Sequence, residues 1–173
     1  MMRRGFTMTE MLVVIVIIAT LAGIAYPITT SLIGNAREAA CLQKLRSIGI
    51  GFQAYLQDNN NRLPELAPGR TSKSQDIPVI ETVLKDYVGG EDAFHCPADR
   101  EQFLKSGSSY GWNSTQNGLH ITQLSFFGVQ GKPELIPLIT DKESWHPHGT
   151  NILYADSSSS NKLRFQVRNP EKP

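Results

Sequence analysis

The stretch that decides the fold lies at the N-terminus, where residues 3–28 read RRGFTMTEMLVVIVIIATLAGIAYPI. Two arginines precede an apolar run, and residues 11–28 carry no charged side chain. A helix of about 20 apolar residues, rising ~1.5 Å per residue, is long enough to cross a bilayer. The sequence therefore predicts a transmembrane helix over residues 6–28. Arg3 and Arg4 would hold its N-terminus in the cytoplasm.

An ordinary secretory signal peptide fits this segment less well. The charged region is short, and no small-x-small cleavage site follows the apolar run, which continues into Tyr26 and Pro27. Glu10 stands directly before the run. A carboxylate at the edge of a membrane helix is costly unless it is paired. A simpler interpretation is that Glu10 complements the positive end of the helix dipole.

Residues 3–14 closely resemble the class III leader of type IV pilins and of type II secretion pseudopilins. The resemblance implies that a prepilin peptidase cuts between Gly5 and Phe6 and then N-methylates Phe6. Glycine suits the cleavage site because a missing side chain lets the peptidase approach the backbone closely. Residues 1–5 are then a leader peptide.

The resemblance extends into the apolar run. Glu10 is the fifth residue of the implied mature chain, where the family has an acid. In the family's assembly model, this carboxylate meets the Phe6 amine of a neighbouring subunit and helps to set the stagger of the filament. Pro27 matches the proline near the end of the family's membrane segment, and it predicts a kink in the helix because proline removes one helical hydrogen bond.

The helical pattern continues beyond Pro27. Apolar side chains recur at steps of three or four residues and predict an amphipathic stem helix over residues 29–58, with a stripe made of Cys41, Leu45, Ile48, Phe52 and Leu56. One helix from Phe6 to Asp58 would be about 80 Å long. The polar run after Asp58 favours a turn and ends it.

Residues 59–173 are expected to form a globular head. Residues 78–88 indicate a short helix, and residues 135–140, 151–155 and 163–167 indicate strands. Pro137 predicts that the first strand lies at an edge or is irregular. The serine run at 157–160 is predicted to lie in the loop of a hairpin. The expected fold class is α+β and pilin-like, with a long N-terminal helix packed on a small, mostly antiparallel sheet.

The head carries a second resemblance. The segments FHCPAD, SYGWN and HPHGTNILYADS, in this order, look like the pseudopilin-like proteins that carry an H-x9-D-G signature in the C-terminal sheet. His146 and Asp156 match the first two signature positions. Ser157 stands where the signature has glycine, so the local turn is the point at which this chain departs from the family.

Composition excludes some classes of function. The formal net charge is +1, so no nucleic-acid partner is expected. No serine lies in a nucleophile-elbow setting, and catalysis is not expected. The two cysteines, Cys41 and Cys96, are either one disulfide that fastens the stem to the head or two separate buried thiols. Tyr110, Trp112 and two phenylalanines at 126–127 are interpreted as head core, with an exposed recognition patch as the alternative.

Two metal hypotheses arise from the head, although no cofactor is expected. Zinc could use a set made of His95, Cys96, His146, His148 and Asp156, but these lack the tight ligand pair of structural zinc sites. Calcium could use Asp141 and Asp156, helped by Asn151 and Ser157, although calcium prefers six to eight oxygens and the region has no clustered acidic loop.

The resemblance leaves three functions open. The first is a structural subunit of a type II secretion-like pseudopilus that drives protein export. The second is a major or minor type IV pilin for adhesion, motility or DNA uptake. The third is a membrane-anchored binding protein or enzyme that uses a prepilin-type leader. The implied partners are a prepilin peptidase, the bacterial inner membrane, a homo- or hetero-oligomeric filament and its assembly machinery. The head would be periplasmic before assembly.

Overall fold

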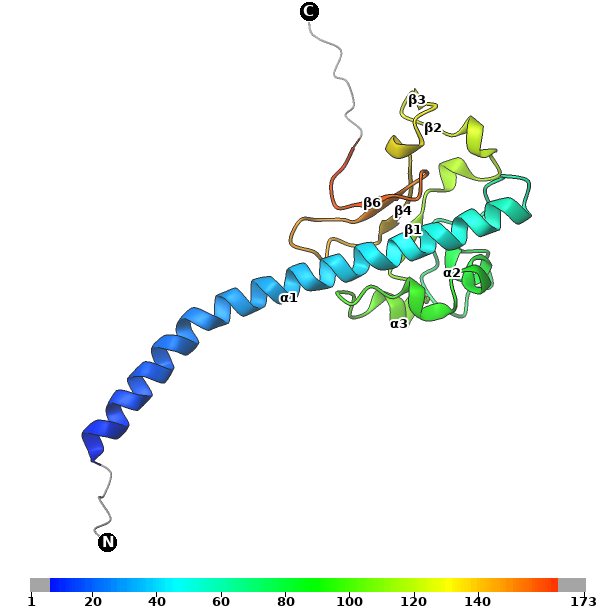
Figure 1. The fold of residues 1–173 in the computed structure, drawn as a ribbon. Coiled ribbons are helices and arrows are strands. Elements are labelled where there is room, and N and C mark those ends of the chain that lie inside the picture. Colours follow the sequence, from blue (N-terminus) through cyan, green and yellow to red (C-terminus); the bar gives the residue numbers. More distant parts are fainter. Residues whose placement is uncertain (1–6, 165–173) are drawn as a thin grey trace, which may run out of the picture.

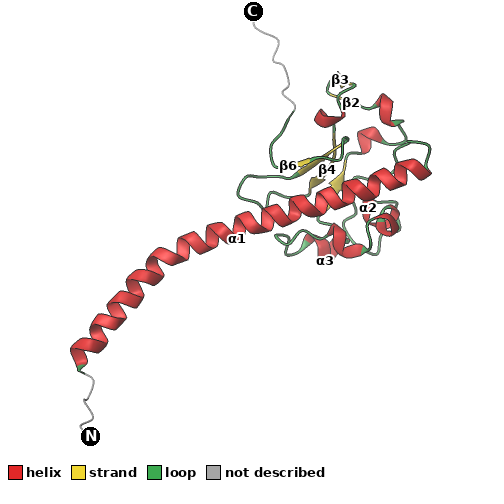
Figure 2. Cartoon of the chain, viewed as in Figure 1, coloured by secondary structure: helices red, strands yellow, loops and turns green. Residues whose placement is uncertain are grey.

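The computed structural model describes residues 7–164 of the chain. A single long helix, α1 (Met8–Asp58), runs through the molecule, and a small head is built along its C-terminal half (Figure 1). The N-terminal half of α1 extends away from the head. The expected α+β class is confirmed: the head holds short antiparallel strands and several short helices (Figure 2).

Helix α1 is continuous through Pro27. Its free half bends gradually in Figure 1, so the expected kink takes the form of a curve and not a break. The hydroxyls of Thr29 and Thr30, which follow the proline, donate to the carbonyls of Ala25 and Pro27. The helix ends at Asp58, as expected, and the chain then turns through Asn60 and Asn61, both with positive φ. The predicted start at Phe6 lies outside the described residues.

The two halves of α1 differ in what covers them. The N-terminal half is long and apolar enough to cross a membrane, and its most apolar 18 residues are not buried by the head. The C-terminal half buries the predicted stripe in the head, so the periodicity identified the face correctly; its five members are 0–2 % exposed: Cys41, Leu45, Ile48, Phe52 and Leu56. Hydrophobic burial holds the head on the stem.

The head begins with short helical segments and continues with a sheet. The helices are α2 (Ile80–Val83), α3 (Gln102–Ser106) and five 3₁₀ turns at Lys85–Tyr87, Glu91–Phe94, Ser114–Gln116, Ile121–Gln123 and Pro133–Leu135. The strands are β1 (Tyr110–Trp112), β2 (Ser125–Phe126), β3 (Val129–Gln130), β4 (Pro137–Asp141), β5 (Ile152–Tyr154) and β6 (Ser159–Ser160). All pairs are antiparallel, in a four-stranded sheet of order β1-β4-β5-β6 and a separate β2-β3 pair.

Of the two alternatives predicted from Pro137, the edge position is wrong, whereas the irregularity of the strand is confirmed by the register shift at Pro137. Strand β4 lies inside the sheet and pairs with both β1 and β5. Proline is tolerated because it is the first residue of β4, where the register shifts before Ile139. Its carbonyl still accepts a hydrogen bond from Asn113 Nδ2 (2.8 Å).

The last predicted strand is also misplaced. On the side away from β4, β5 pairs with β6, which lies in the serine run that was expected to be loop, with Ile152 opposite Ser160. Residues 163 and 164 are not in a strand, and residues 165–167 lie outside the described part. The chain reverses early because Ser157 adopts a left-handed conformation, with φ of 64°. Ser159 Oγ then donates to the carbonyl of Leu42 on the stem (3.0 Å).

The aromatic side chains of the head divide between core and surface. Tyr110 and Trp112 are buried, and the Trp112 ring lies 5.7 Å from that of Phe52 on the stem. Phe126 is partly buried against the core, whereas Phe127 is 74 % exposed. The core interpretation therefore describes three of the four.

Candidate functional site: the N-terminal helix and its junction with the head

The first turn of α1 is closed by a reciprocal cap. The Thr7 backbone N–H and hydroxyl both donate to Glu10 Oε2 (2.8 Å each), and the Glu10 N–H donates to Thr7 Oγ1 (3.3 Å). This capping box satisfies backbone donors that a helix start leaves unpaired. Glu10 thus already has a role within its own chain. The expected cleavage site, Gly5–Phe6, lies outside the described residues, and its amine would arise one residue before Thr7.

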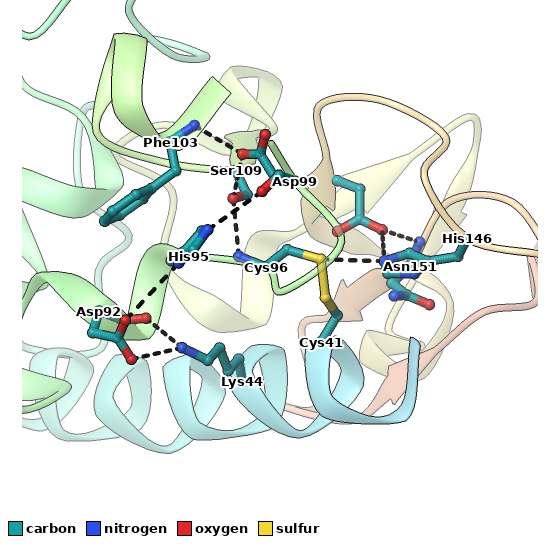
Figure 3. The surroundings of a disulfide bond; sticks show 11 residues. Cys41, Lys44, Asp92, His95, Cys96, Asp99, Phe103, Ser109, His146 and Asn151 are labelled. Carbon is teal, nitrogen blue, oxygen red and sulfur yellow. Dashed lines mark hydrogen bonds and ion pairs between the residues drawn. A yellow bond between two sulfur atoms is a disulfide. The ribbon is translucent and has the colours of Figure 1, made fainter. Parts of the chain in front are cut away.

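The junction of stem and head is covalent. Cys41 and Cys96 form a disulfide between α1 and the segment after the Glu91–Phe94 turn, with Cα atoms 5.1 Å apart and a sequence separation of 55 (Figure 3). Both cysteines are 0 % exposed. The pairing that the sequence left open is therefore a stem-to-head cross-link.

A buried polar group lies against the disulfide. His146 Nε2 lies 3.3 Å from Cys96 Sγ and 3.5 Å from Asp141 Oδ2, and Asp141 Oδ2 accepts the Asn151 N–H (2.7 Å). Figure 3 shows His146 directed at the sulfur atoms. Burial raises the pKa of Asp141 to about 7 and lowers the pKa of His146. Both groups are therefore favoured in their neutral forms, which is the cheaper state for buried ionisable groups.

A second polar contact fixes the stem one turn earlier. Glu38 on α1 is 3 % exposed, and its two carboxylate oxygens meet His148 Nδ1 (2.8 Å) and Asn161 Nδ2 (2.7 Å). Burial raises the pKa of Glu38, but the hydrogen bonds from His148 and Asn161 outweigh it, so the pKa lies below its usual value. One stem carboxylate therefore joins two loops of the head.

The structure does not assemble the zinc ligand set proposed from the sequence. Of that set, only Cys96 and His146 meet, in a group with Cys41 in which the two sulfur atoms are already bonded to each other. His95 stacks on the Phe103 ring (4.4 Å) instead. His148 contacts Glu38.

The calcium candidates are also separated. Asp141 is the last residue of β4 and lies beside Asn151. Asp156 lies two residues after Tyr154, and Tyr154 pairs with Pro137 at the opposite end of β4. Asp156 Oδ1 accepts the Ser158 N–H (2.9 Å), so this carboxylate closes the turn between β5 and β6. The arrangement gives Asp141 and Asp156 separate structural roles.

The signature turn is tied to the stem through the residue that departs from the signature. Ser157 Oγ donates to the Gly49 carbonyl (3.2 Å) and accepts from Gln53 Nε2 (2.9 Å). His146, the other end of the signature, packs near the disulfide. The two ends of the signature segment, His146 and Ser157, therefore lie at two separate contacts between the head and the stem.

Sequence reasoning missed two functional contacts. The Thr7–Glu10 box has a readable signal, since T-x-x-E before an apolar run is the capping-box pattern. Glu38 had no such signal, because it looked like a solvated residue beside the apolar stripe and its partners, His148 and Asn161, are more than 100 residues away.

The helix, its apolar free half and the α+β head fit a membrane-anchored single-pass protein of pilin-like build. Residues 1–26 match the family model described as the prokaryotic N-terminal methylation motif. This motif supports a type IV pilin-like or pseudopilin subunit, and it implies processing by prepilin peptidase and assembly into a filament. Comparisons with curated proteins and with solved structures gave no significant match.

Proposed function

We propose that the chain is a structural subunit of a type II secretion-like pseudopilus that drives protein export. The observation that carries this proposal is the prepilin-type motif on a continuous helix whose free half is apolar and uncovered. In this role the subunit resides in the inner membrane before assembly, with its N-terminus in the cytoplasm and its head in the periplasm. Cleavage after Gly5 then releases it for helix-on-helix packing.

The placement of the disulfide favours a pseudopilus over an adhesive pilus. Many adhesive pilins carry a disulfide-closed loop near the C-terminus. Here the two cysteines of the chain are both used between stem and head, at Cys41 and Cys96. A type IV pilin for adhesion, motility or DNA uptake is the second candidate, and the leader supports it equally well.

A non-catalytic role is part of the proposal. A cysteine does lie beside a histidine, at Cys96 and His146, but there the sulfur is bonded in the disulfide and fully buried. An enzyme or binding protein that only uses the leader is the third candidate. The proposal also includes no cofactor.

Deletion of the gene tests the proposal. We expect the deletion strain to retain its secreted proteins inside the envelope while surface pili, twitching motility and DNA uptake are unchanged. Complementation with the wild-type gene should restore secretion. Normal secretion with lost pili would favour the second candidate, and a strain with both intact that lacks only a binding or enzymatic activity would favour the third.

A further inference from the structure

The position of the first charged residue after Glu10 sets the level of the membrane surface on α1. Arg37 follows Glu10 by 27 residues, and no charged residue lies between them. At ~1.5 Å per residue this interval is about 40 Å, close to the ~40–45 Å thickness of a bilayer with its headgroup layers. With Glu10 at one surface, Arg37 lies in the headgroup layer of the other.

A depression in the protein surface opens at this level. It has a volume of about 430 Å³ and lies between α1 and the head. Its lining includes Gly34 and Arg37 from the stem, Arg100 and Glu101 before α3, and Trp145. The head comes close to the helix at its edge, where a Cβ on Gly34 would lie 3.2 Å from Pro147 Cγ.

The two arginines that line the depression have no protein partner. Within residues 7–164, neither Arg37 nor Arg100 forms an ion pair or a side-chain hydrogen bond, although acidic side chains lie in the same depression. Guanidinium groups bind phosphate oxygens with paired, charge-assisted hydrogen bonds. Two unpaired guanidinium groups in a headgroup layer therefore offer a phosphate site.

The acidic side chains of the depression are mostly occupied. Asp99 accepts backbone N–H groups at the start of α3, and its pKa is lowered because these bonds and one from Ser109 outweigh burial, which raises it. Glu143 accepts Gln102 Nε2 (2.6 Å) and the Trp145 indole N–H (3.2 Å). Glu101 has no side-chain partner among the described residues, and it leaves one carboxylate available for a cation.

We propose that this depression binds the headgroup of a zwitterionic phospholipid. Arg37 and Arg100 take the phosphate, and Glu101 takes the ammonium group. Trp145 is a half-buried member of the same lining, and tryptophan is enriched at the membrane–water interface. The bound lipid holds the head against the membrane surface before the subunit leaves the bilayer. This inference needs only the membrane insertion of α1 and is independent of the kind of filament.

Quenching of Trp145 fluorescence by brominated lipid tests the proposal. The full chain is inserted into vesicles of phosphatidylethanolamine and phosphatidylglycerol, with bromine on the acyl chains of one lipid or the other at equal mole fraction. The signal of the Trp145→Phe variant is subtracted to remove Trp112. We expect brominated phosphatidylethanolamine to quench Trp145 more strongly than brominated phosphatidylglycerol.

Matched variants separate the site from simple anchoring. Arg37→Gln combined with Arg100→Gln should abolish the difference between the two lipids, whereas Arg46→Gln, an exposed stem arginine outside the depression, should keep it. Glu101→Gln should reduce the preference for the ethanolamine lipid. Equal quenching by both lipids in the wild type, or an unchanged difference in the double arginine variant, would overturn the proposal. Loss of the quenching difference on adding inorganic phosphate would show a free-anion site instead.

Discussion

Ser157 occupies a backbone conformation that favours glycine, yet its hydroxyl makes two contacts with the stem. Its φ is 64°, and its Oγ bonds to Gly49 and Gln53. A left-handed conformation costs a non-glycine residue roughly 1–2 kcal/mol. Glycine, the residue that the H-x9-D-G signature has at this position, would avoid this cost, whereas Ser157 offsets it with hydrogen bonds.

Two substitutions at position 157 separate these effects. Ser157→Ala loses the hydrogen bonds and keeps the backbone strain, so we expect its free energy of unfolding to be about 1–2 kcal/mol lower than that of wild type. Ser157→Gly loses the same bonds but relieves the strain, so it should be more stable than the alanine variant by about 1 kcal/mol. Chemical unfolding of the full chain in detergent, followed by tryptophan fluorescence, measures both. An alanine variant as stable as the glycine variant would contradict the account.

Asp141 should make folding less favourable as the pH rises. Its pKa is raised from 3.8 to about 7, so the folded state holds a proton that the unfolded state has lost between these values. The stability contributed by the protonated Asp141 is therefore greatest below about pH 4 and is lost as the pH rises to about 7. His146 acts in the opposite direction, because a lowered histidine pKa makes stability fall as the pH drops below ~6.5.

The difference in unfolding free energy between wild type and Asp141→Asn isolates the first effect. We expect wild type to lose stability relative to the variant as the pH rises from about 4 to about 7. Asp76→Asn, which changes an exposed carboxylate, is the control and should follow wild type. A difference that is flat over this range would show that Asp141 is ionised in the folded protein.

For single residues, the sequence predicted which side chains are buried better than it predicted which side chains they contact. Cys41 was placed on the buried stripe by periodicity, and that position is why it can reach Cys96. The place of His146 beside the disulfide could not be predicted, since it depends on the path of a long loop between β4 and β5. Glu38 was missed for the same reason.

At the scale of elements, close approach of α1 to the head depends on a glycine. A Cβ on Gly51 would lie 2.5 Å from Val88 Cγ1 and 2.8 Å from the carbonyl oxygen of Tyr87. Gly51→Ala should therefore destabilise the head by about 1–3 kcal/mol through overpacking, reduced by about 1 kcal/mol of gain in helix propensity.

Urea unfolding of the full chain in detergent measures this effect. Gly23→Ala is the matched control, because a Cβ there meets nothing within 4 Å and the residue lies in the uncovered half of the same helix. We expect the control to leave the unfolding midpoint of the head unchanged. A stabilised Gly51→Ala variant would mean that the Lys85–Tyr87 turn can move away from the stem without cost.

The disulfide joins two elements that are distant in sequence. Closing a loop of 55 residues restricts the unfolded chain, and the chain-entropy model gives a stabilisation of about 4 kcal/mol. We therefore expect Cys41→Ser combined with Cys96→Ser to lower the unfolding midpoint substantially. Adding reductant should lower the midpoint of the wild type and leave the double variant unchanged. An equal midpoint in all four samples would show that the cross-link adds no stability.

Elements with strong periodicity were predicted well. The stem and its buried face followed from apolar spacing, and its end at Asp58 followed from a polar turn. Strands were harder, because they are only two to five residues long and depend on their partners. The serine run became β6 through contacts with β5 and Leu42, which no local propensity shows.

At the scale of the whole molecule, Glu10 caps its own helix and is proposed to pair with a neighbouring subunit, and mutations can separate the two roles. If the proposed pairing with the neighbouring Phe6 amine sets the filament, Glu10→Ala should leave peptidase cleavage and membrane insertion intact and abolish filaments. Thr7→Val removes the threonine hydroxyl of the capping box but keeps the carboxylate, so it should still assemble. Immunoblots of processing and sheared filament yields measure both outcomes. Equal loss of filaments in the two variants would assign the effect to helix capping alone.

The leader predicted the class of the molecule from about thirty residues, because its chemistry is local in sequence. Whether the filament serves protein export or a pilus function could not be predicted from a local sequence motif. It depends on surfaces of the head that meet other subunits, and these surfaces have no compact signal in one sequence.

The place of the disulfide along α1 also has a mechanical consequence. In the proposed assembly a subunit is drawn out of the bilayer by its helix, so tension along α1 would reach the head at its membrane-proximal edge, near Glu38 and Cys41. Peeling of the head from that edge would otherwise break noncovalent contacts one after another. Because a covalent bond lies within one turn of the first buried stem residue, the head moves with the helix as one body under load.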